Sequence, residues 1–158
     1  NKQPTHQAKH SSCGVIVPGV DTIAVSLANC CRPIPGDPII GYISKGQGVK
    51  VHRADCPNII NEKKRLIPVQ WEEGLDEKQY EVNLIIHSDD RNYLLSDIVT
   101  TLQQCNVYLK HVDSAVDDGN LEATTKLTVS VKNAAHLQNL ISNLKKVRSV
   151  NEVIRTIQ

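Results

Sequence analysis

The stretch from Ala28 to Cys56 constrains this chain more than any other feature, because it concentrates turn-forming residues and metal-ligand residues. It reads ANCCRPIPGDPIIGYISKGQGVKVHRADC and holds three of the five cysteines, one histidine and three of the seven prolines. Three thiols and one imidazole are a complete ligand set for a tetrahedral zinc ion. The stretch therefore predicts a small module whose candidate zinc ligands are Cys30, Cys31, His52 and Cys56, with Asp55 as a replacement for one thiol.

The spacing of these residues leaves a second interpretation open. His52 and Cys56 have a workable separation for one ion, but Cys30 and Cys31 are adjacent. Neighbouring side chains of an extended backbone point to opposite sides, so both thiols can reach one ion only if the chain turns there. In the alternative, the three cysteines are packed thiols, and His52, Asp55 and Cys56 face a partner.

Local patterns predict a β-rich module over residues 14–72, after a polar linker at residues 1–13. Ile39–Ile43 and Gly48–His52 predict a hairpin whose turn is Ser44–Gln47, because glycine interrupts two runs rich in β-branched residues. Shorter strands are predicted at 15–17, 22–27 and 66–71. Asp55 is expected to cap a short helix that begins near Cys56, with proline in its first turn.

Charge separates the chain into two parts. Residues 1–70 hold nine Lys/Arg against four Asp/Glu, a net charge of +5, and residues 71–158 hold nine against thirteen, a net charge of −4. The first part can therefore approach a polyanion. With no phenylalanine, one tryptophan and four tyrosines, a base-stacking platform is not expected. No apolar run reaches the roughly 20 residues that span a bilayer, and the absence of methionine suggests a piece of a longer protein.

Residues 79–158 predict a second domain with the order βαββαβ. Val82, Leu84 and Ile86 alternate as in a strand, and a helix with one apolar face follows, for which Ser88, Asp89 and Asp90 are the expected cap residues. A hairpin turn is predicted at 117–120, and a second helix is predicted to begin at Asn133. The predicted fold class is α+β, a small β-rich module followed by a ferredoxin-like domain.

The residues CCRPIPGDPIIGYISKGQGVKVHRADCPN resemble the double-cysteine module of the Rel/SpoT family, also called its zinc-finger or RIS module. Residues 79–158, with the loop DDRNYLLSDI, resemble the ACT domain that follows it. The resemblance implies a regulatory, non-catalytic fragment of a cytoplasmic (p)ppGpp synthetase/hydrolase, a GTP pyrophosphokinase of the stringent response. Its active sites would lie upstream, and the fragment would bind no nucleotide. The implied partners are ribosomal RNA, A-site tRNA and the upstream catalytic domains.

The resemblance also implies sites. Candidate contacts to ribosomal RNA are Arg32, Lys45, Lys50, Arg53 and Asp55. The ACT ligand loop corresponds to Asp89, Asp90, Arg91, Asn92, Tyr93 and Leu94. Tyr93 stands where the family commonly has glycine, which argues against binding of a branched-chain amino acid.

Two alternatives remain open. One is an amino-acid-responsive ACT dimer that acts on the catalytic domains in cis, without the ribosome; a homodimer through the ACT domain is expected in either case. The other is a zinc or thiol enzyme, for which Asp55 is the only nearby candidate base and no substrate pocket is evident.

Overall fold

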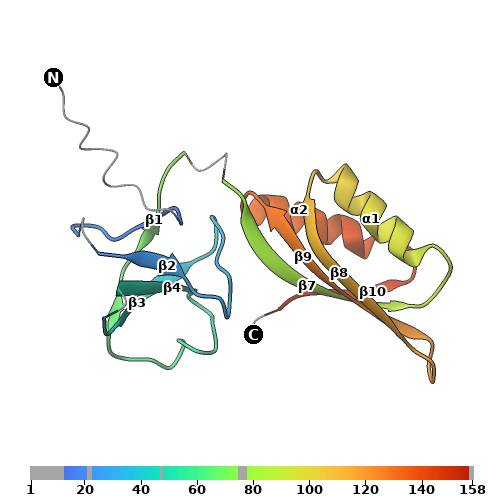
Figure 1. Ribbon diagram of the computed structural model, residues 1–158, viewed down its shortest axis with the longest axis horizontal. Coiled ribbons are helices and arrows are strands. Elements are labelled where there is room, and N and C mark those ends of the chain that lie inside the picture. Colours follow the sequence, from blue (N-terminus) through green and yellow to red (C-terminus); the bar gives the residue numbers. More distant parts are fainter. Residues whose placement is uncertain (1–12, 21–22, 47, 75–77, 157–158) are drawn as a thin grey trace. The chain divides into compact units, whose positions relative to one another are not determined.

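The computed structural model describes residues 13–20, 23–46, 48–74 and 78–156. The chain divides into two compact units, with the boundary between Glu77 and Lys78. The first unit is built from short strands, and the second contains two helices and four longer strands (Figure 1). The α+β class predicted from the sequence is confirmed. In the part of the chain described here, neither helix is long and apolar enough to cross a membrane.

The first unit contains two small sheets. One pairs β1 (Val15–Ile16) with β6 (Gln70–Trp71). The other has four strands in the order β2 (Val25–Leu27), β4 (Gly48–Arg53), β3 (Ile39–Ser44) and β5 (Leu66–Ile67). The predicted hairpin is present, since β3 and β4 pair antiparallel along their whole length. Strand β2 joins the same sheet parallel to β4, which no local pattern in the sequence indicated.

Each face of this four-stranded sheet packs against a different hydrophobic cluster. Val49 and Val51 are fully buried on one face, against Val15 and Val17. Ile40 and Tyr42 of β3 pack on the other cluster, whose buried members are Ala28, Cys31, Cys56 and Ile59. Because successive residues of a strand point to opposite faces, the hairpin separates a valine core from a cysteine-containing core.

Two local predictions for this unit were wrong. The strand expected at 66–71 is split into β5 and β6, which belong to different sheets. Pro68 lies in the gap and cannot donate a ladder hydrogen bond. The short helix expected after Asp55 is a series of turns, in which the amides of Ile59 and Ile60 both donate to the carbonyl of Cys56. The Asp55 carboxylate pairs with Arg53 instead of capping.

The second unit has the predicted βαββαβ order. Its elements are β7 (Tyr80–Asp89), α1 (Leu94–Gln104), β8 (Tyr108–Asp117), β9 (Glu122–Val131), α2 (Ala134–Lys145) and β10 (Val150–Arg155). The strands form an antiparallel sheet in the order β10-β7-β9-β8. Both helices cover the same face of that sheet (Figure 1), and the core between them includes Leu84, Ile98, Leu127 and Leu140. This is the ferredoxin-like arrangement.

The two helices begin differently. The Asn133 side chain accepts a hydrogen bond from the amide of His136, which confirms the predicted cap of α2. The cap predicted for α1 from Ser88, Asp89 and Asp90 is wrong. Helix α1 is preceded by Tyr93 in a left-handed backbone conformation (φ 66°), without a side-chain cap.

Candidate metal centre

Cys30, Cys31, His52 and Cys56 form one compact cluster in the first unit. Their ligand atoms, the three Sγ atoms and one ring nitrogen of His52, all lie within 4.8 Å of one another. The Cys30 Sγ is 3.6 Å from the Cys56 Sγ, 3.9 Å from the Cys31 Sγ and 3.5 Å from Nδ1 of His52. The Cys31 Sγ is 3.9 Å from the same nitrogen. The structure thus brings together the four candidate ligands named from the sequence.

A turn resolves the difficulty posed by the adjacent cysteines. Residues 29–31 are a turn after β2, closed by a hydrogen bond from the Arg32 amide to the Ala28 carbonyl. Arg32 then takes a left-handed conformation (φ 46°). Within a helix-like turn, adjacent side chains are separated by about 100° instead of 180°. Both thiols therefore face the same side of the chain.

The other two side chains come from the end of β4 and the turn that follows it. His52 is next to last in β4, and the amide of Cys56 donates to the carbonyl of Arg53, so the chain reverses at once. This reversal places the Cys56 sulfur beside the His52 ring. The four donors therefore belong to two chain segments, 30–31 and 52–56, which the sheet holds together.

The donor set and its dimensions fit a tetrahedral metal ion. With Zn–S bonds of about 2.3 Å and a Zn–N bond of about 2.0 Å, the edges of such a site are about 3.8 Å between sulfurs and about 3.5 Å between sulfur and nitrogen. Four of the six separations are 3.5–3.9 Å, and the other two are within 4.8 Å. Four protein ligands leave no open coordination position, which is the composition of a structural rather than a catalytic site. The cluster could therefore hold a metal ion as a staple between the two segments.

Burial and mutual contact shift the pKa values of these groups in different directions. Burial raises the pKa of the Cys31 thiol to about 12, although the Arg53 amide that donates to it acts the other way. Burial also acts to raise the pKa of Cys30, but its hydrogen bonds with Asn58, Cys56 and Cys31 outweigh burial and lower that pKa. Burial, followed by the charge of Lys50, lowers the pKa of His52. A neutral imidazole is the form that binds metal, and a bound cation would displace the remaining thiol protons.

Two groups that support the cluster were missed from the sequence. The backbone amide of Arg53 donates to the Cys31 sulfur at 3.2 Å. The Asn58 side chain contributes a hydrogen bond to Cys30. Neither belongs to a spacing motif, so only the folded chain reveals them. Such outer contacts orient metal ligands and stabilise thiolates.

The structure does not bring Asp55 into the cluster. Its carboxylate is exposed and accepts a hydrogen bond from the Arg53 guanidinium at 3.0 Å. A zinc or thiol enzyme would need an open position or a base at the cluster. The candidate base is paired with Arg53 and is not part of the cluster, and the complete donor set leaves no open position, so the geometry gives the enzyme interpretation no support.

The basic residues predicted to contact RNA differ in exposure. Lys45 is exposed at the end of the hairpin, and Lys50 is half-buried on β4. Arg32 is also half-buried and has a partner of its own. The Arg53 side chain is only 16% exposed and is paired with Asp55. Among the described residues, no partner pairs with Lys45 or Lys50, so the charges of these two candidates remain available to a phosphate.

In the second unit, the predicted ACT ligand loop is fixed by Arg91. Its guanidinium donates twice to the carbonyl of Arg148, at 2.9 and 3.1 Å, once to the carbonyl of Asn92, and once to the Asp97 carboxylate. These contacts bind the loop before α1 to the connection between α2 and β10. The Tyr93 ring is 78% exposed, so it lies in solvent and does not fill a buried pocket.

Comparison with known proteins assigns both units. Residues 15–72 match the family model of the RelA/SpoT RIS domain, and residues 76–155 match that of the ACT domain. A GTP pyrophosphokinase of Haemophilus influenzae is 35% identical over 151 residues, which are 93% of this chain and 20% of that protein. A bifunctional (p)ppGpp synthase/hydrolase RelA of Mycobacterium tuberculosis is 32% identical over 155 residues, 96% of this chain and 21% of that protein. The chain thus spans about one fifth of the length of these relatives.

A solved structure also resembles the second unit. The crystal structure of the ACT domain from a GTP pyrophosphokinase of Chlorobium tepidum aligns with a TM-score of 0.45 at 23% identity. The alignment covers 49% of this chain and 99% of that domain.

Proposed function

Because this chain belongs to the RelA/SpoT family, as a C-terminal regulatory region with a RIS domain and an ACT domain, we propose that it senses the state of the ribosome for a (p)ppGpp synthetase/hydrolase. The synthetase and hydrolase domains of the family are not part of this chain. In this proposal, the region binds ribosomal RNA when uncharged tRNA occupies the A-site, in the cytoplasm, and passes that state to catalytic domains in cis. The observation that carries it is the cysteine–histidine cluster at the open end of the β3–β4 hairpin, on which Lys45 and Lys50 lie.

Zinc is the metal that we propose for the cluster. Thiolate and imidazole donors at tetrahedral edge lengths suit zinc, and the small β-rich unit has a limited core of its own. A staple between residues 30–31 and 52–56 would hold β4 and the turn after it in one conformation. The role of the metal is then structural, because it presents the hairpin surface rigidly.

The proposed RNA contact is to the phosphate backbone. Lys45 and Lys50 lie on the hairpin of the first unit, in which residues 1–70 have a net charge of +5, whereas the second unit, residues 78–156, holds nine Lys/Arg and nine Asp/Glu and has no net charge. A domain without net charge has no overall attraction to RNA, so binding is expected to depend on the first unit. Phosphate contacts give a steep dependence of affinity on salt, and each lost contact reduces the slope by about one.

The test is a ribosome-binding assay at several salt concentrations. Lys45→Glu combined with Lys50→Glu should weaken binding and flatten its salt dependence. The matched control is Lys145→Glu combined with Lys146→Glu, which changes the net charge equally on exposed positions at the end of α2. If both variants lose ribosome affinity equally, the effect comes from overall charge and not from the hairpin. If neither variant loses affinity, the hairpin does not contact RNA.

We propose that the second unit also forms a homodimer through the edge of its sheet. Strand β8 is an edge strand of ten residues with most side chains exposed. Exposed apolar side chains lie on β8 itself, at Val116, and on helix α1, at Leu95 and Val99. An exposed edge with apolar neighbours is a template for pairing with another copy. Val112→Pro in β8 should abolish such a dimer in sedimentation analysis.

An amino-acid-responsive ACT domain is the alternative proposal. It requires the loop before α1 to open toward a ligand, yet Arg91 of this loop is occupied by backbone carbonyls and Asp97. Two buried hydroxyls nearby, those of Ser88 and Ser149, have no hydrogen-bond partner among the described residues. Calorimetric titration with valine tests this alternative on the unaltered chain and on Tyr93→Gly. If neither protein shows a heat of binding, the amino-acid-responsive alternative is wrong.

A further inference from the structure

The three sulfurs of the cysteine–histidine cluster differ in how far solvent reaches them. Cys30 is half-buried, whereas Cys31 and Cys56 are buried, with 1% and 0% of their surfaces exposed. A thiol is oxidised where an oxidant can reach it. Cys30 is therefore the sulfur of this cluster that a small dissolved oxidant meets first.

Cys56 is the thiol placed to form a disulfide with Cys30. Their Sγ atoms are 3.6 Å apart, and a disulfide requires about 2.05 Å. Cys31 is a poorer partner, although its sulfur is 3.9 Å from that of Cys30. Adjacent Cα atoms are about 3.8 Å apart across a trans peptide bond, whereas disulfides usually join Cα atoms about 4.4–6.8 Å apart. No peptide bond among the described residues is cis, so a bond between Cys30 and Cys31 would be strained.

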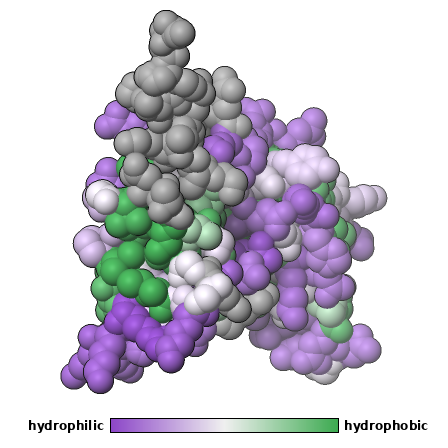
Figure 2. All heavy atoms as spheres, turned by 60° about the vertical axis from the view of Figure 1, so that its left-hand side comes forward, coloured by the Kyte–Doolittle hydropathy of each residue, from purple (hydrophilic) through white to green (hydrophobic). Residues whose placement is uncertain are grey.

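The chain that follows Cys56 allows the two sulfurs to approach. Residues 57–65 form turns and bends and belong to no strand or helix, and most of their side chains are exposed. Figure 2 shows the hydrophilic side chains that gather along the lower end of the first unit, where this segment lies. The Cys31 sulfur, in contrast, is held by the amide of Arg53, which donates to it at 3.2 Å. Cys56 can therefore shift toward Cys30 without the loss of a strand pairing.

We propose that Cys30 and Cys56 are an oxidation site, at which a peroxide converts the two thiols into a disulfide. With hydrogen peroxide, the Cys30 sulfur attacks one oxygen, the O–O bond breaks, and the thiol proton leaves with the other oxygen as water. The Cys56 sulfur then displaces the hydroxyl group of the Cys30 sulfenic acid, and this hydroxyl leaves with the Cys56 proton as a second water. One hydrogen peroxide thus takes two electrons from the two sulfurs, which become joined by an S–S bond.

The disulfide joins the same two chain segments as a metal ion in the cluster, residues 30–31 and 52–56. It consumes two of the four donors, so the disulfide and the metal exclude each other. Because the two cysteines are 26 residues apart, the bond removes many conformations of the unfolded first unit. Oxidation therefore exchanges one staple for another and preserves the fold around the β3–β4 hairpin. The disulfide concerns the thiols alone, and only the release of zinc rests on the proposed metal site.

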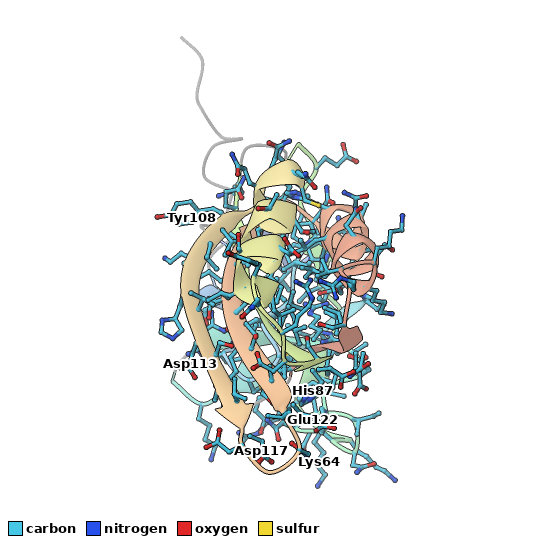
Figure 3. The ribbon with its side chains drawn as sticks, turned by 90° about the vertical axis from the view of Figure 1, so that its right-hand side faces the viewer. Lys64, His87, Tyr108, Asp113, Asp117 and Glu122 are labelled. Atoms are coloured by element: carbon cyan, nitrogen blue, oxygen red, sulfur yellow. The ribbon has the colours of Figure 1, made fainter. Side chains whose placement is uncertain are left out.

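The other two cysteines lie apart from this cluster. Cys13 packs on the valine cluster of the first unit and donates to the carbonyl of Val25. Cys105 is 8% exposed and lies in the second unit, where α1 and α2 cover the same face of the sheet (Figure 3). Neither sulfur belongs to the group of four ligand atoms. Both thiols therefore serve as internal references in a test of oxidation.

The experiment is mass spectrometry of the whole chain, stripped of metal by a chelator and then treated with hydrogen peroxide. The oxidised chain should be lighter by two hydrogen atoms. The chain contains no methionine, the other side chain that peroxide readily oxidises. Trypsin cleaves between Cys31 and Cys56, at Lys45, Lys50 and Arg53. The fragment with the double cysteine and the fragment with Cys56 should nevertheless remain joined until a reductant is added.

Matched variants identify the sulfur that pairs with Cys56. Cys31→Ser should still form the cross-link, and Cys30→Ser should lose it. Tandem mass spectrometry of the joined wild-type fragments makes the same assignment without any variant. A wild-type chain whose fragments stay separate after peroxide treatment, or a cross-link of equal yield in the two variants, would overturn the proposal.

The denaturant midpoint of Trp71 fluorescence tests the exchange of staples in the first unit. The oxidised metal-free chain should have a higher midpoint than the reduced metal-free chain, and dithiothreitol should reverse the gain. Equal midpoints would show that the disulfide does not replace the metal as a staple.

Zinc measurements separate this proposal from the proposed metal site. From zinc-loaded chain, peroxide should release one zinc for each disulfide formed. If the purified chain holds no zinc and the cross-link still forms, the metal site is wrong and the oxidation site stands. If the chain binds zinc but forms no cross-link after the metal is removed, the oxidation site is wrong and the metal site stands.

Discussion

The Sγ atoms of Cys30 and Cys56 lie 3.6 Å apart, although 26 residues separate them in the chain. A disulfide would bring the two sulfurs to about 2.05 Å, and all five cysteines are free thiols. The separation is that of two ligands on one tetrahedral ion. Two optical probes report on the two units separately. Trp71, the sole tryptophan, reports on the first unit, and ellipticity at 222 nm reports on α1 and α2, the helices of the described residues, which lie in the second unit.

Chain purified without a tag or chelator should contain about one zinc per molecule by elemental mass spectrometry. Cys56→Ser should lose the metal and lower the denaturant midpoint of Trp71 fluorescence, because the staple between residues 30–31 and 52–56 is gone. Ellipticity at 222 nm should keep its midpoint. Cys105→Ser, a buried thiol of the second unit, is the control and should retain zinc. Two results would contradict the prediction: wild-type protein that contains no zinc, and a Cys56→Ser variant whose Trp71 midpoint equals that of the wild type.

Gly48→Ala should destabilise the first unit by about 2–3 kcal/mol. Gly48 has a left-handed φ of 81°, and an added Cβ would come within 2.3 Å of the Ala24 carbonyl oxygen, across the β2–β4 pairing. Gly46→Ala is the matched control, with φ 72° and no atom within 4 Å of its Cβ. It should cost about 1 kcal/mol, for the backbone alone. Equal costs from Trp71 fluorescence in urea would show that the close approach of Ala24 is unimportant.

Tyr93→Gly should stabilise the second unit by about 0.5–1 kcal/mol. A non-glycine residue at φ 66° costs about 1–2 kcal/mol, from which the extra chain entropy of glycine subtracts about 0.5–1 kcal/mol. The exposed ring offers little packing to offset this gain. Urea unfolding followed at 222 nm measures the change. Tyr93→Ala removes the ring but keeps the strain, so it should not stabilise; if it does, the ring rather than the backbone is the cause.

Asn133→Ala should destabilise the second unit by about 1 kcal/mol, because the amide of His136 loses its acceptor at the start of α2. The transition at 222 nm should shift while the Trp71 transition stays in place. Ser142→Ala, at an exposed position within the same helix, is the control and should be neutral or slightly stabilising. A loss as large for Ser142→Ala as for Asn133→Ala would mean that α2 responds to any substitution and not to its cap.

Local patterns in the sequence were sufficient for most elements. The alternation in β7 and β9, the apolar faces of α1 and α2 and the Asn133 cap are each confined to a few neighbouring residues. The hairpin of β3 and β4 was predictable for the same reason, since glycine marks its turn. Predictions were wrong where a residue had two options. Asp55 could cap a helix or pair with Arg53, and the fold selected the pair.

The sequence by itself determined which residues could bind a metal, since the donor types of Cys30, Cys31, His52 and Cys56 are independent of the fold. Only the tertiary structure decided that they converge. That outcome depends on the turn at residues 29–31 and on the parallel pairing of β2 with β4, which positions that turn beside the end of β4. Such pairing joins segments more than twenty residues apart. Its stability comes from burying Val49 and Val51 against Val15 and Val17, a contact that no short window of sequence contains.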